Sequence, residues 1–226
     1  MDFRYTLRIL ARTPGFTAMA VATLALGIGI NTIVFTTYGS VAFRQLPVRA
    51  PGEMVRFQWR SGGFPSDQFS WTEYERLATI THSFATAIAT STPQTIVCKL
   101  PDSTPNSAEV VRVRLVSANY FDALGVKPLI GRAFATDDRA VAIVSHDFWT
   151  RKLRADPKLD GKTLSVQGVA LSIVGVAPEK FAGTGVPPRA PELWIPASAQ
   201  ASILPGVDWM HDGVAREWQV FGAASV

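Results

Sequence analysis

An uncharged stretch near the N-terminus limits the architectures open to this chain. The 31 residues between Arg12 and Arg44 contain no Asp, Glu, Lys, Arg or His. As an α-helix this stretch would be about 46 Å long, which exceeds the hydrocarbon core of a bilayer, about 30 Å thick. Pro14-Gly15 is expected to break its first part. We therefore predict a transmembrane helix from about Phe16 to Phe43.

Two other interpretations of this stretch are weaker. A cleavable signal peptide would have an apolar region of about 7–15 residues, and this one continues far past any Ala-x-Ala cleavage site. A buried core helix of a water-soluble protein is argued against by so long a run without a charge. We therefore expect the segment to span a membrane.

Small and polar residues share one face of this helix. Thr23, Gly27 and Asn31 recur at every fourth position. Small residues let a second helix approach closely, and an amide within a membrane is stabilised by a partner across a helix interface. The spacing is not a strict G-x-x-x-G, so self-dimerisation through that motif is not indicated. We expect this face to pack against another helix; the alternative is a tolerant helix that faces lipid.

Residues 1–13 form a charged arm before the membrane segment. Arg4, Arg8 and Arg12 make a basic stripe at helical spacing, separate from the apolar positions. Such an amphipathic helix can lie in the headgroup plane with its arginines toward anionic lipid. Equally, the arginines can be a charged flank that fixes topology. We expect a cytoplasmic N-terminus and an extracytoplasmic main domain, because a large domain can translocate regardless of its charge.

The composition excludes some classes of partner. The 226 residues carry a net charge of +4, and no basic stripe interleaved with aromatic residues could follow a nucleic-acid backbone. His82, His146 and His211 lie far apart, so no metal site is predicted. The single cysteine, Cys98, lies in an apolar alternation and is predicted to be buried.

Beyond residue 44, short helices and strands alternate without regular long crossovers, which favours an α+β fold over a doubly wound sheet. Gly125 is expected to stop one helix, and Gln167-Gly168 to form a hairpin turn. The expected helix caps are Ser70 or Thr72, Ser117 and Ser145. Helices are predicted at Phe69–Phe84, Ser117–Gly125 and Ser145–Leu153, and strands at Thr95–Leu100, Glu109–Val116, Ala140–Val144, Lys162–Val166 and Val169–Val176.

Two motifs carry the residue types of enzymes without the required spacing. Gly161–Thr163 matches the end of a phosphate-binding loop, but Asp156 stands where that loop needs a glycine. Ser145–Asp147 holds Ser, His and Asp, yet adjacent residues on a helix point about 100° apart and cannot form a catalytic relay. An anchored hydrolase is therefore the least favoured reading. We predict that the chain is not an enzyme and needs no cofactor.

Five segments in series carry a resemblance to a known family. In order they are LRILARTPGFTAMAVATLALGIGINTIVF, LVSANYFDALGVKPLIGRAF, VAIVSHDFWTRKL, GKTLSVQGVALSIVGVAP and LWIP. Together they resemble the start of a MacB-like (FtsX-like) ABC transporter permease, of the duplicated orphan permease branch. The resemblance implies a first transmembrane helix followed by a MacB-like periplasmic core domain. Together with the amphipathic cytoplasmic arm at 1–13, we therefore expect the transmembrane helix at 14–43 and the periplasmic core domain at 44–226.

The resemblance also implies a function. In that family the ATPase is usually a separate domain or subunit, and ATP cycles are transmitted across the membrane as mechanical motion. This chain would be the N-terminal portion of a permease subunit of an ABC-type export or mechanotransmission system in the cell (inner) membrane. Its partners would be the lipid bilayer, the remaining permease helices or a second permease copy, and a separate ATPase subunit.

The likeness departs from the family at the end of the chain. Such permeases continue with three further transmembrane helices, whereas this sequence ends in REWQVFGAASV, with GAAS where the family commonly reads GRLKPG. We therefore expect the periplasmic domain to be incomplete at its C-terminus. The alternative function is a single-pass membrane-anchored sensor or binding module without a transport role.

Overall fold

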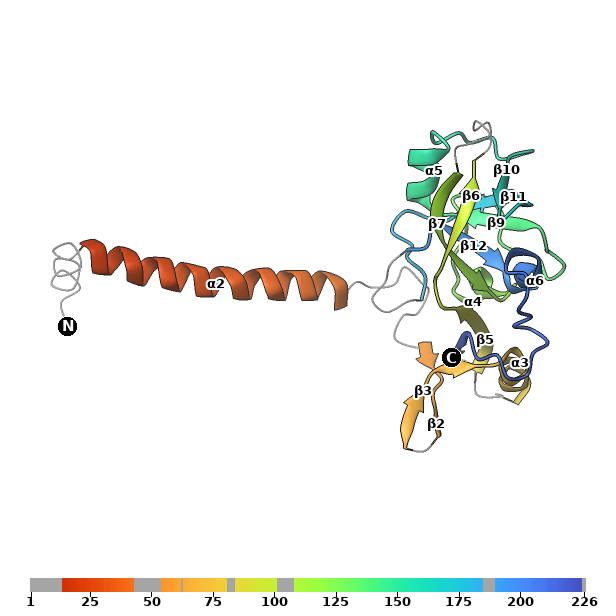
Figure 1. The fold of residues 1–226 in the computed structure, drawn as a ribbon, viewed down its shortest axis with the longest axis horizontal. Helices are drawn as coiled ribbons and strands as arrows, with labels where there is room; N and C mark the ends of the chain where they lie inside the picture. The colour runs from red at the N-terminus through yellow and green to blue at the C-terminus, as the bar shows by residue number, and fades with distance from the viewer. Residues whose placement is uncertain are drawn as a thin grey trace. The chain divides into compact units, whose positions relative to one another are not determined.

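The computed structural model describes residues 14–42, 54–61, 63–80, 84–100, 108–184 and 190–224 of the chain. The chain divides into two units, Met1–Gln45 and Leu46–Val226. Within the described residues, the first unit contains helix α2 and the second contains the strands and shorter helices (Figure 1). This mixture of elements confirms the predicted α+β class.

Helix α2 extends over Pro14–Ala42. Its 29 residues make it about 44 Å long. The part at Pro14–Thr36 is apolar and long enough to cross a membrane. The predicted break at Pro14-Gly15 stays a prediction, because residues 1–13 lie outside the described residues and α2 is described from Pro14 onward.

Six of the strands that the structure describes close into a barrel. Their hydrogen-bonded order is β6-β7-β12-β9-β11-β10, and β10 pairs with β6 to complete the ring. The β7–β12 and β9–β11 pairs are parallel, and the other four are antiparallel. Closure leaves these six strands without a free sheet edge within the barrel. The bounds are β6 Gln94–Lys99, β7 Ala108–Val116, β9 Val141–Val144, β10 Thr163–Val166, β11 Val169–Val176 and β12 Leu193–Pro196.

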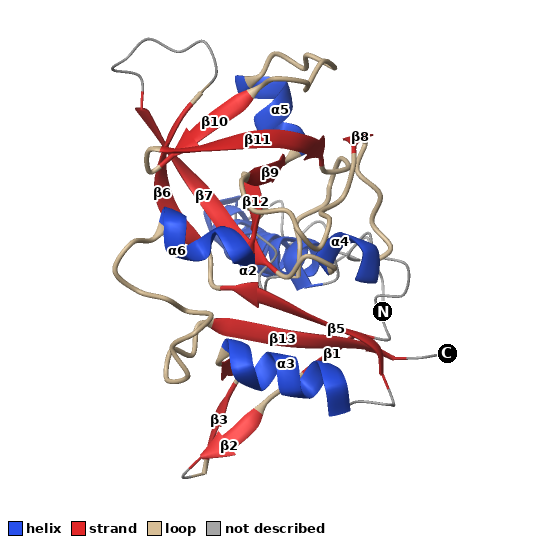
Figure 2. Ribbon diagram, turned by 90° about the vertical axis from the view of Figure 1, so that its right-hand side faces the viewer, coloured by secondary structure: helices blue, strands red, loops and turns tan. Residues whose placement is uncertain are grey.

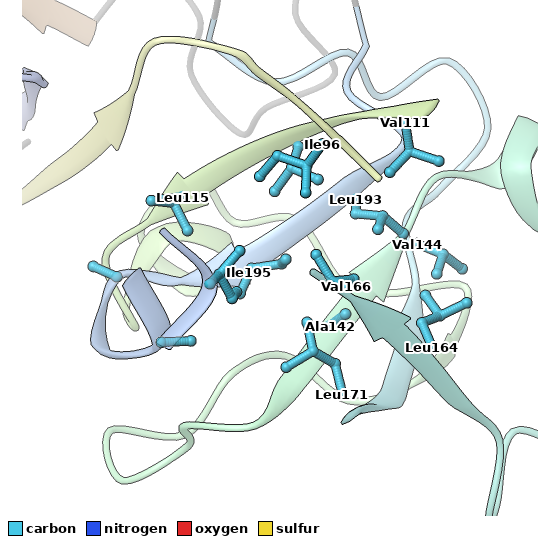
Figure 3. Packing of buried hydrophobic residues seen from close by; sticks show 14 of the residues in the cluster. Ile96, Val111, Leu115, Ala142, Val144, Leu164, Val166, Leu171, Leu193 and Ile195 are labelled. Atoms are coloured by element: carbon cyan, nitrogen blue, oxygen red, sulfur yellow. The ribbon is translucent and has the colours of Figure 1, made fainter. Parts of the chain in front are cut away.

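Aliphatic side chains fill the barrel because successive residues of a strand point to opposite faces. On β12, Leu193 and Ile195 belong to one core, whereas Trp194 between them belongs to another. Figure 3 shows the inward side chains meeting between the strands. We name this set the barrel core: Ile96, Val111, Leu115, Ala142, Val144, Leu164, Val166, Leu171, Leu193 and Ile195.

A second core packs rings against the outside of the barrel. Helix α4, Tyr120–Ala123, supplies Phe121, whose ring centroid lies 5.7 Å from that of Phe134 and 5.7 Å from that of Trp194. Both contacts are edge-on, the geometry that ring quadrupoles favour. We name this set the aromatic core: Tyr120, Phe121, Phe134, Phe181 and Trp194.

A three-stranded layer adjoins the barrel. In it β13 lies between β1 and β5, and helix α3 packs against β5 and β13 (Figure 2). The layer joins the barrel where Thr90 of β5 pairs with Val116 of β7. The Ser117 hydroxyl strengthens this joint by accepting a hydrogen bond from the Ala89 N–H at 3.1 Å. The bounds are β1 Met54–Arg56, β5 Phe84–Ser91, β13 Trp218–Ala224 and α3 Trp71–Ile80.

Shorter elements complete the described fold. Strands β2 and β3 form a separate hairpin, β4 pairs with β13, and β8 pairs with β11. Their bounds, with those of the remaining helices, are β2 Trp59–Ser61, β3 Phe64–Ser66, β4 Gln68–Phe69, β8 Ile130–Gly131, α5 His146–Lys152, the 3-10 helix η2 Ala197–Ala199 and α6 Gln200–Ile203.

The predicted helix at Phe69–Phe84 is confirmed in its centre and wrong at its ends. Helix α3 begins after Ser70, whose hydroxyl accepts from the Glu73 N–H at 3.2 Å while a Glu73 carboxylate oxygen accepts from the Ser70 N–H at 2.8 Å. This reciprocal capping box fixes the start. Phe69 belongs to β4 and Phe84 to β5, because pairing with β13 outweighs local helical spacing there.

The remaining helix caps and turns that the sequence predicted are found in the structure, except for the cap at Ser117. Ser145 caps α5 by accepting from the Phe148 N–H at 3.1 Å, as predicted. Gly125 ends the turn after α4 with a φ of +64°. Ser117 is not a helix cap, because its hydroxyl is engaged by the neighbouring layer; Asn119 occupies the N-cap position of α4. The predicted hairpin turn is confirmed, with φ of +52° at Gln167 and +84° at the following glycine.

Candidate functional site

The exposed face of α2 is the first candidate. Thr23, Gly27 and Asn31 are all exposed. The Thr23 hydroxyl donates to the Met19 carbonyl oxygen at 2.9 Å, so its hydrogen bond stays within the helix. A side chain added at Gly27 would meet no atom outside the helix backbone within 4 Å. This face therefore combines a small central position with an amide whose side chain makes no hydrogen bond to any described residue. Packing of the face against another helix stays a prediction.

The arm residues Arg4, Arg8 and Arg12 lie outside the described residues. Their predicted contact with the membrane surface therefore also stays a prediction.

A cleft between α3 and the barrel is the second candidate. Its volume is about 660 Å³, and its lining is mainly apolar. Trp71 and Tyr74 of α3 form one wall, and the segments that follow β7 and β12 form the other. The opposite wall and rim include Asn119, Arg139, Pro196 and Met210. A site of this size and character suits an amphipathic ligand or an apolar side chain of a partner.

Few polar groups in this cleft are free to bind a ligand. The Trp71 indole N–H donates to a Glu75 carboxylate oxygen at 2.8 Å. The Asn119 amide nitrogen donates to the Ala87 carbonyl oxygen at 2.9 Å, while its amide oxygen is buried without a partner in the described structure. Burial raises the pKa of the Tyr74 phenol, so this group stays neutral near pH 7. Arg139 is exposed and supplies a positive charge at the cleft that a ligand could contact.

The motifs that resemble enzyme signatures have structural roles. The Ser145 hydroxyl is occupied as the cap of α5. The Lys162 ammonium donates to Asp156 at 2.6 Å, and this hydrogen bond lowers the pKa of the Asp156 carboxyl. Lys162 is therefore held by the residue that stands where a phosphate-binding loop would have glycine, and the chain then enters β10 rather than a helix.

Cys98 is fully buried, as predicted. Burial raises the pKa of its thiol to about 12, which makes the reactive thiolate scarce at neutral pH. Among the described residues, no three His, Cys, Asp or Glu side chains gather as metal ligands would.

Sequence reasoning missed the cleft and the surroundings of Arg114. The cleft is built from segments that are far apart in the chain, and no local sequence pattern predicts that these segments lie side by side. The sequence gives a weak indication for Arg114, because this charged residue lies between Val113 and Leu115 in a predicted strand. The structure buries it, with 4% of its surface exposed.

An apolar helix long enough to cross a membrane, followed by a barrel with an attached α/β layer, defines a membrane-associated α+β domain. The family model described as MacB-like periplasmic core domain matches residues 17–220. The chain belongs to this family, which is the periplasmic domain of MacB-like ABC transporter permeases. The resemblance inferred from the five segments is confirmed.

Solved structures support the same fold. The periplasmic region of MacB from Actinobacillus actinomycetemcomitans is 15% identical, with a TM-score of 0.55 over 76% of this chain and 74% of that one. A domain of a putative permease protein from Porphyromonas gingivalis is 14% identical, with a TM-score of 0.55 over 76% and 75%. The extracellular domain of the noncanonic ABC-type transporter YknZ from Gram-positive bacteria is 14% identical, with a TM-score of 0.54 over 76% and 84%. A comparison with curated proteins found no match.

Proposed function

We propose that this chain is the N-terminal portion of a permease subunit that couples a cytoplasmic ATPase to an extracytoplasmic domain, in an ABC-type export or mechanotransmission system. One observation carries the proposal: a single family match, over residues 17–220, includes most of α2 as well as the barrel and the α3 layer. The role is mechanical. The remaining permease helices or a second permease copy would surround α2, and a separate ATPase would act from the cytoplasmic side.

The order of the elements supports a route for mechanical coupling. Along the chain, α2 is followed by β1, which pairs with β13 in the outer layer. The layer reaches the barrel through the Thr90–Val116 pair and the Ser117–Ala89 hydrogen bond. A displacement transmitted along the chain from α2 would enter this layer first and then the barrel. The cleft lies on that path and would change shape with it.

The coupling is tested in right-side-out membrane vesicles that contain the full chain and its native partners. Vesicles are loaded with ATP or with ADP, and the rate at which external protease cuts the extracytoplasmic domain is measured. The proposal predicts at least about a twofold difference between ATP and ADP, because hydrolysis inside would change the domain outside. Equal rates with both nucleotides would contradict coupling.

Orientation is part of the proposal and has its own test. We propose that residues 1–13 are cytoplasmic, that 14–43 span the inner membrane, and that 44–226 are extracytoplasmic. Protease added to intact spheroplasts should then digest the main domain and spare a cytoplasmic marker protein. Protection of the domain in spheroplasts, with digestion only after lysis, would refute this topology.

The cleft favours a second candidate function, a single-pass anchored sensor or binding module. Its volume of about 660 Å³ falls within the range of small-molecule sites, and aromatic side chains form one wall. The same vesicle experiment separates the two functions, because a sensor that works without an ATPase would show no dependence on internal nucleotide.

A further inference from the structure

Among the described residues, Arg114 has no ion-pair partner. It is on β7 between Val113 and Leu115, which point into the barrel, so its own side chain points outward. Its register partner on β12 is Trp194 of the aromatic core. Only 4% of Arg114 is exposed, so the fold buries a side chain that is charged at any physiological pH.

The Arg114 guanidinium has donors without acceptors. Its Nε and Nη1 atoms are buried, and neither has a hydrogen-bond partner in the described structure. The nearest acidic residues along these strands are used elsewhere. A Glu192 carboxylate oxygen accepts from the Arg112 backbone N–H at 2.9 Å, and Glu109 pairs with Lys152 at 2.6 Å. Burial lowers the pKa of Arg114, which is the expected response of a cation that lacks a partner.

Other donors lie beside the guanidinium. The Trp194 indole N–H has no hydrogen-bond partner in the described structure, although it lies near enough to the Tyr120 hydroxyl to lower the pKa of that phenol. Trp194 and Arg114 are paired residues of neighbouring strands, so their side chains lie on the same outer face of the barrel, and the Tyr120 oxygen and the indole nitrogen both lie beside Gly183. The Tyr120 oxygen accepts from the Thr184 N–H at 3.0 Å.

The backbone leaves little room for a side chain beside these donors. Gly183 has a φ of +77°, a conformation that favours glycine. A Cβ at this position would lie 3.0 Å from the Tyr120 oxygen and 3.5 Å from the Trp194 indole nitrogen. A side chain at this position would therefore press on the Tyr120 hydroxyl and the indole ring, and glycine avoids that contact.

We propose that Arg114 and the Trp194 indole N–H form a binding site for a small oxoanion, with carboxylate or phosphate oxygens as the ligand atoms. The guanidinium supplies charge-assisted donors, which are the stronger kind of hydrogen bond, and the indole supplies a neutral one. A bound oxoanion satisfies the buried donors and neutralises the buried charge. This site is separate from the cleft and does not depend on the permease function.

The test is a titration of the full chain in detergent micelles or lipid nanodiscs. Inorganic phosphate and acetate are added at constant ionic strength set with sodium chloride, and tryptophan fluorescence and the unfolding temperature are recorded. The wild type should show a saturable response in both signals, because a ligand that binds only the folded state raises its stability. Arg114→Met should bind at least about tenfold more weakly, because it keeps the apolar stem and loses every donor.

Matched variants locate the response. Arg139→Met removes the exposed cation of the cleft and should leave phosphate binding unchanged. If Arg114→Met does not fold, Arg114→Lys decides the question: it keeps the charge without the planar fork, and should bind phosphate at least about threefold more weakly.

Four results would overturn the proposal. They are the absence of a saturable response in the wild type, full binding by Arg114→Met or Arg114→Lys, loss of binding in Arg139→Met alone, and a response to an acidic peptide with none to phosphate or acetate.

Discussion

Arg132 and Asp138 form a two-pronged ion pair at the surface of the barrel domain. Two guanidinium nitrogens donate to the two carboxylate oxygens at 2.6 and 2.9 Å, and the Ala135 N–H donates to the same carboxylate at 2.8 Å. The hydrogen bond from Arg132 lowers the pKa of Asp138. Because Arg132 is half-exposed, solvent screens the pair, and its contribution to stability is about 1 kcal/mol.

Asp138→Asn should therefore lower the free energy of unfolding by about 1 kcal/mol at pH 7. A carboxyl whose pKa is lowered by folding stabilises the native state above its unfolded pKa, about 3.9, and that contribution is lost as pH falls through the lower folded pKa. The difference between variant and wild type should shrink below about pH 4 in urea unfolding curves. Asp137→Asn, next to the fork, is the control; a difference that persists at low pH would contradict the role of the charge.

At the scale of single elements, β7 gives a matched pair of substitutions. Leu115 is fully buried in the barrel core, whereas Val110 on the same strand is 67% exposed. Leu115→Ala removes buried methyl groups and leaves a cavity, so it should cost about 2–5 kcal/mol of unfolding free energy. Val110→Ala should change it by less than about 0.5 kcal/mol. Equal losses in chemical denaturation would show that the barrel interior is not packed as described.

Two substitutions in helix α2 test whether the Asn31 face packs against another helix. If the Asn31 amide bonds across a helix interface, Asn31→Leu should weaken association in membranes by about 0.6–1.7 kcal/mol, or roughly 3- to 17-fold. Thr32→Val is the control, since the Thr32 hydroxyl already donates to the Ile28 carbonyl oxygen at 2.8 Å within its own helix. Energy transfer between labelled chains and permease partners in vesicles measures both. An unchanged affinity for Asn31→Leu would indicate that this face contacts lipid.

At the scale of the whole domain, the joint between the outer layer and the barrel depends on Ser117. Its hydroxyl accepts from the Ala89 N–H, and its own N–H donates to the Ala89 carbonyl oxygen at 2.9 Å. Ser117→Ala leaves a buried N–H without an acceptor, which costs about 1–3 kcal/mol. Hydrogen exchange at Ala89 should accelerate more than at Val144 inside the barrel. Uniform acceleration at both amides would mean that the layer and barrel open only together.

The sequence predicted the elements of this domain better than their assembly. The α5 cap at Ser145 and the turn at Gln167-Gly168 depend on neighbours within a few residues, and both were predicted. Barrel closure depends on pairs such as Leu193 with Val113, which lie 80 positions apart. The cleft and the environment of Arg114 arise from the same distant pairings, so their residues were visible in the sequence while their proximity was not.

Strand β12 has a thermodynamic consequence for the domain. All four of its residues are buried, and Leu193 and Ile195 face the barrel core while Trp194 faces the aromatic core. Displacing this strand removes support from both interiors at once, so neither can melt while the other stays intact. Heating should give a single calorimetric peak for the domain, with a van't Hoff enthalpy equal to the measured heat.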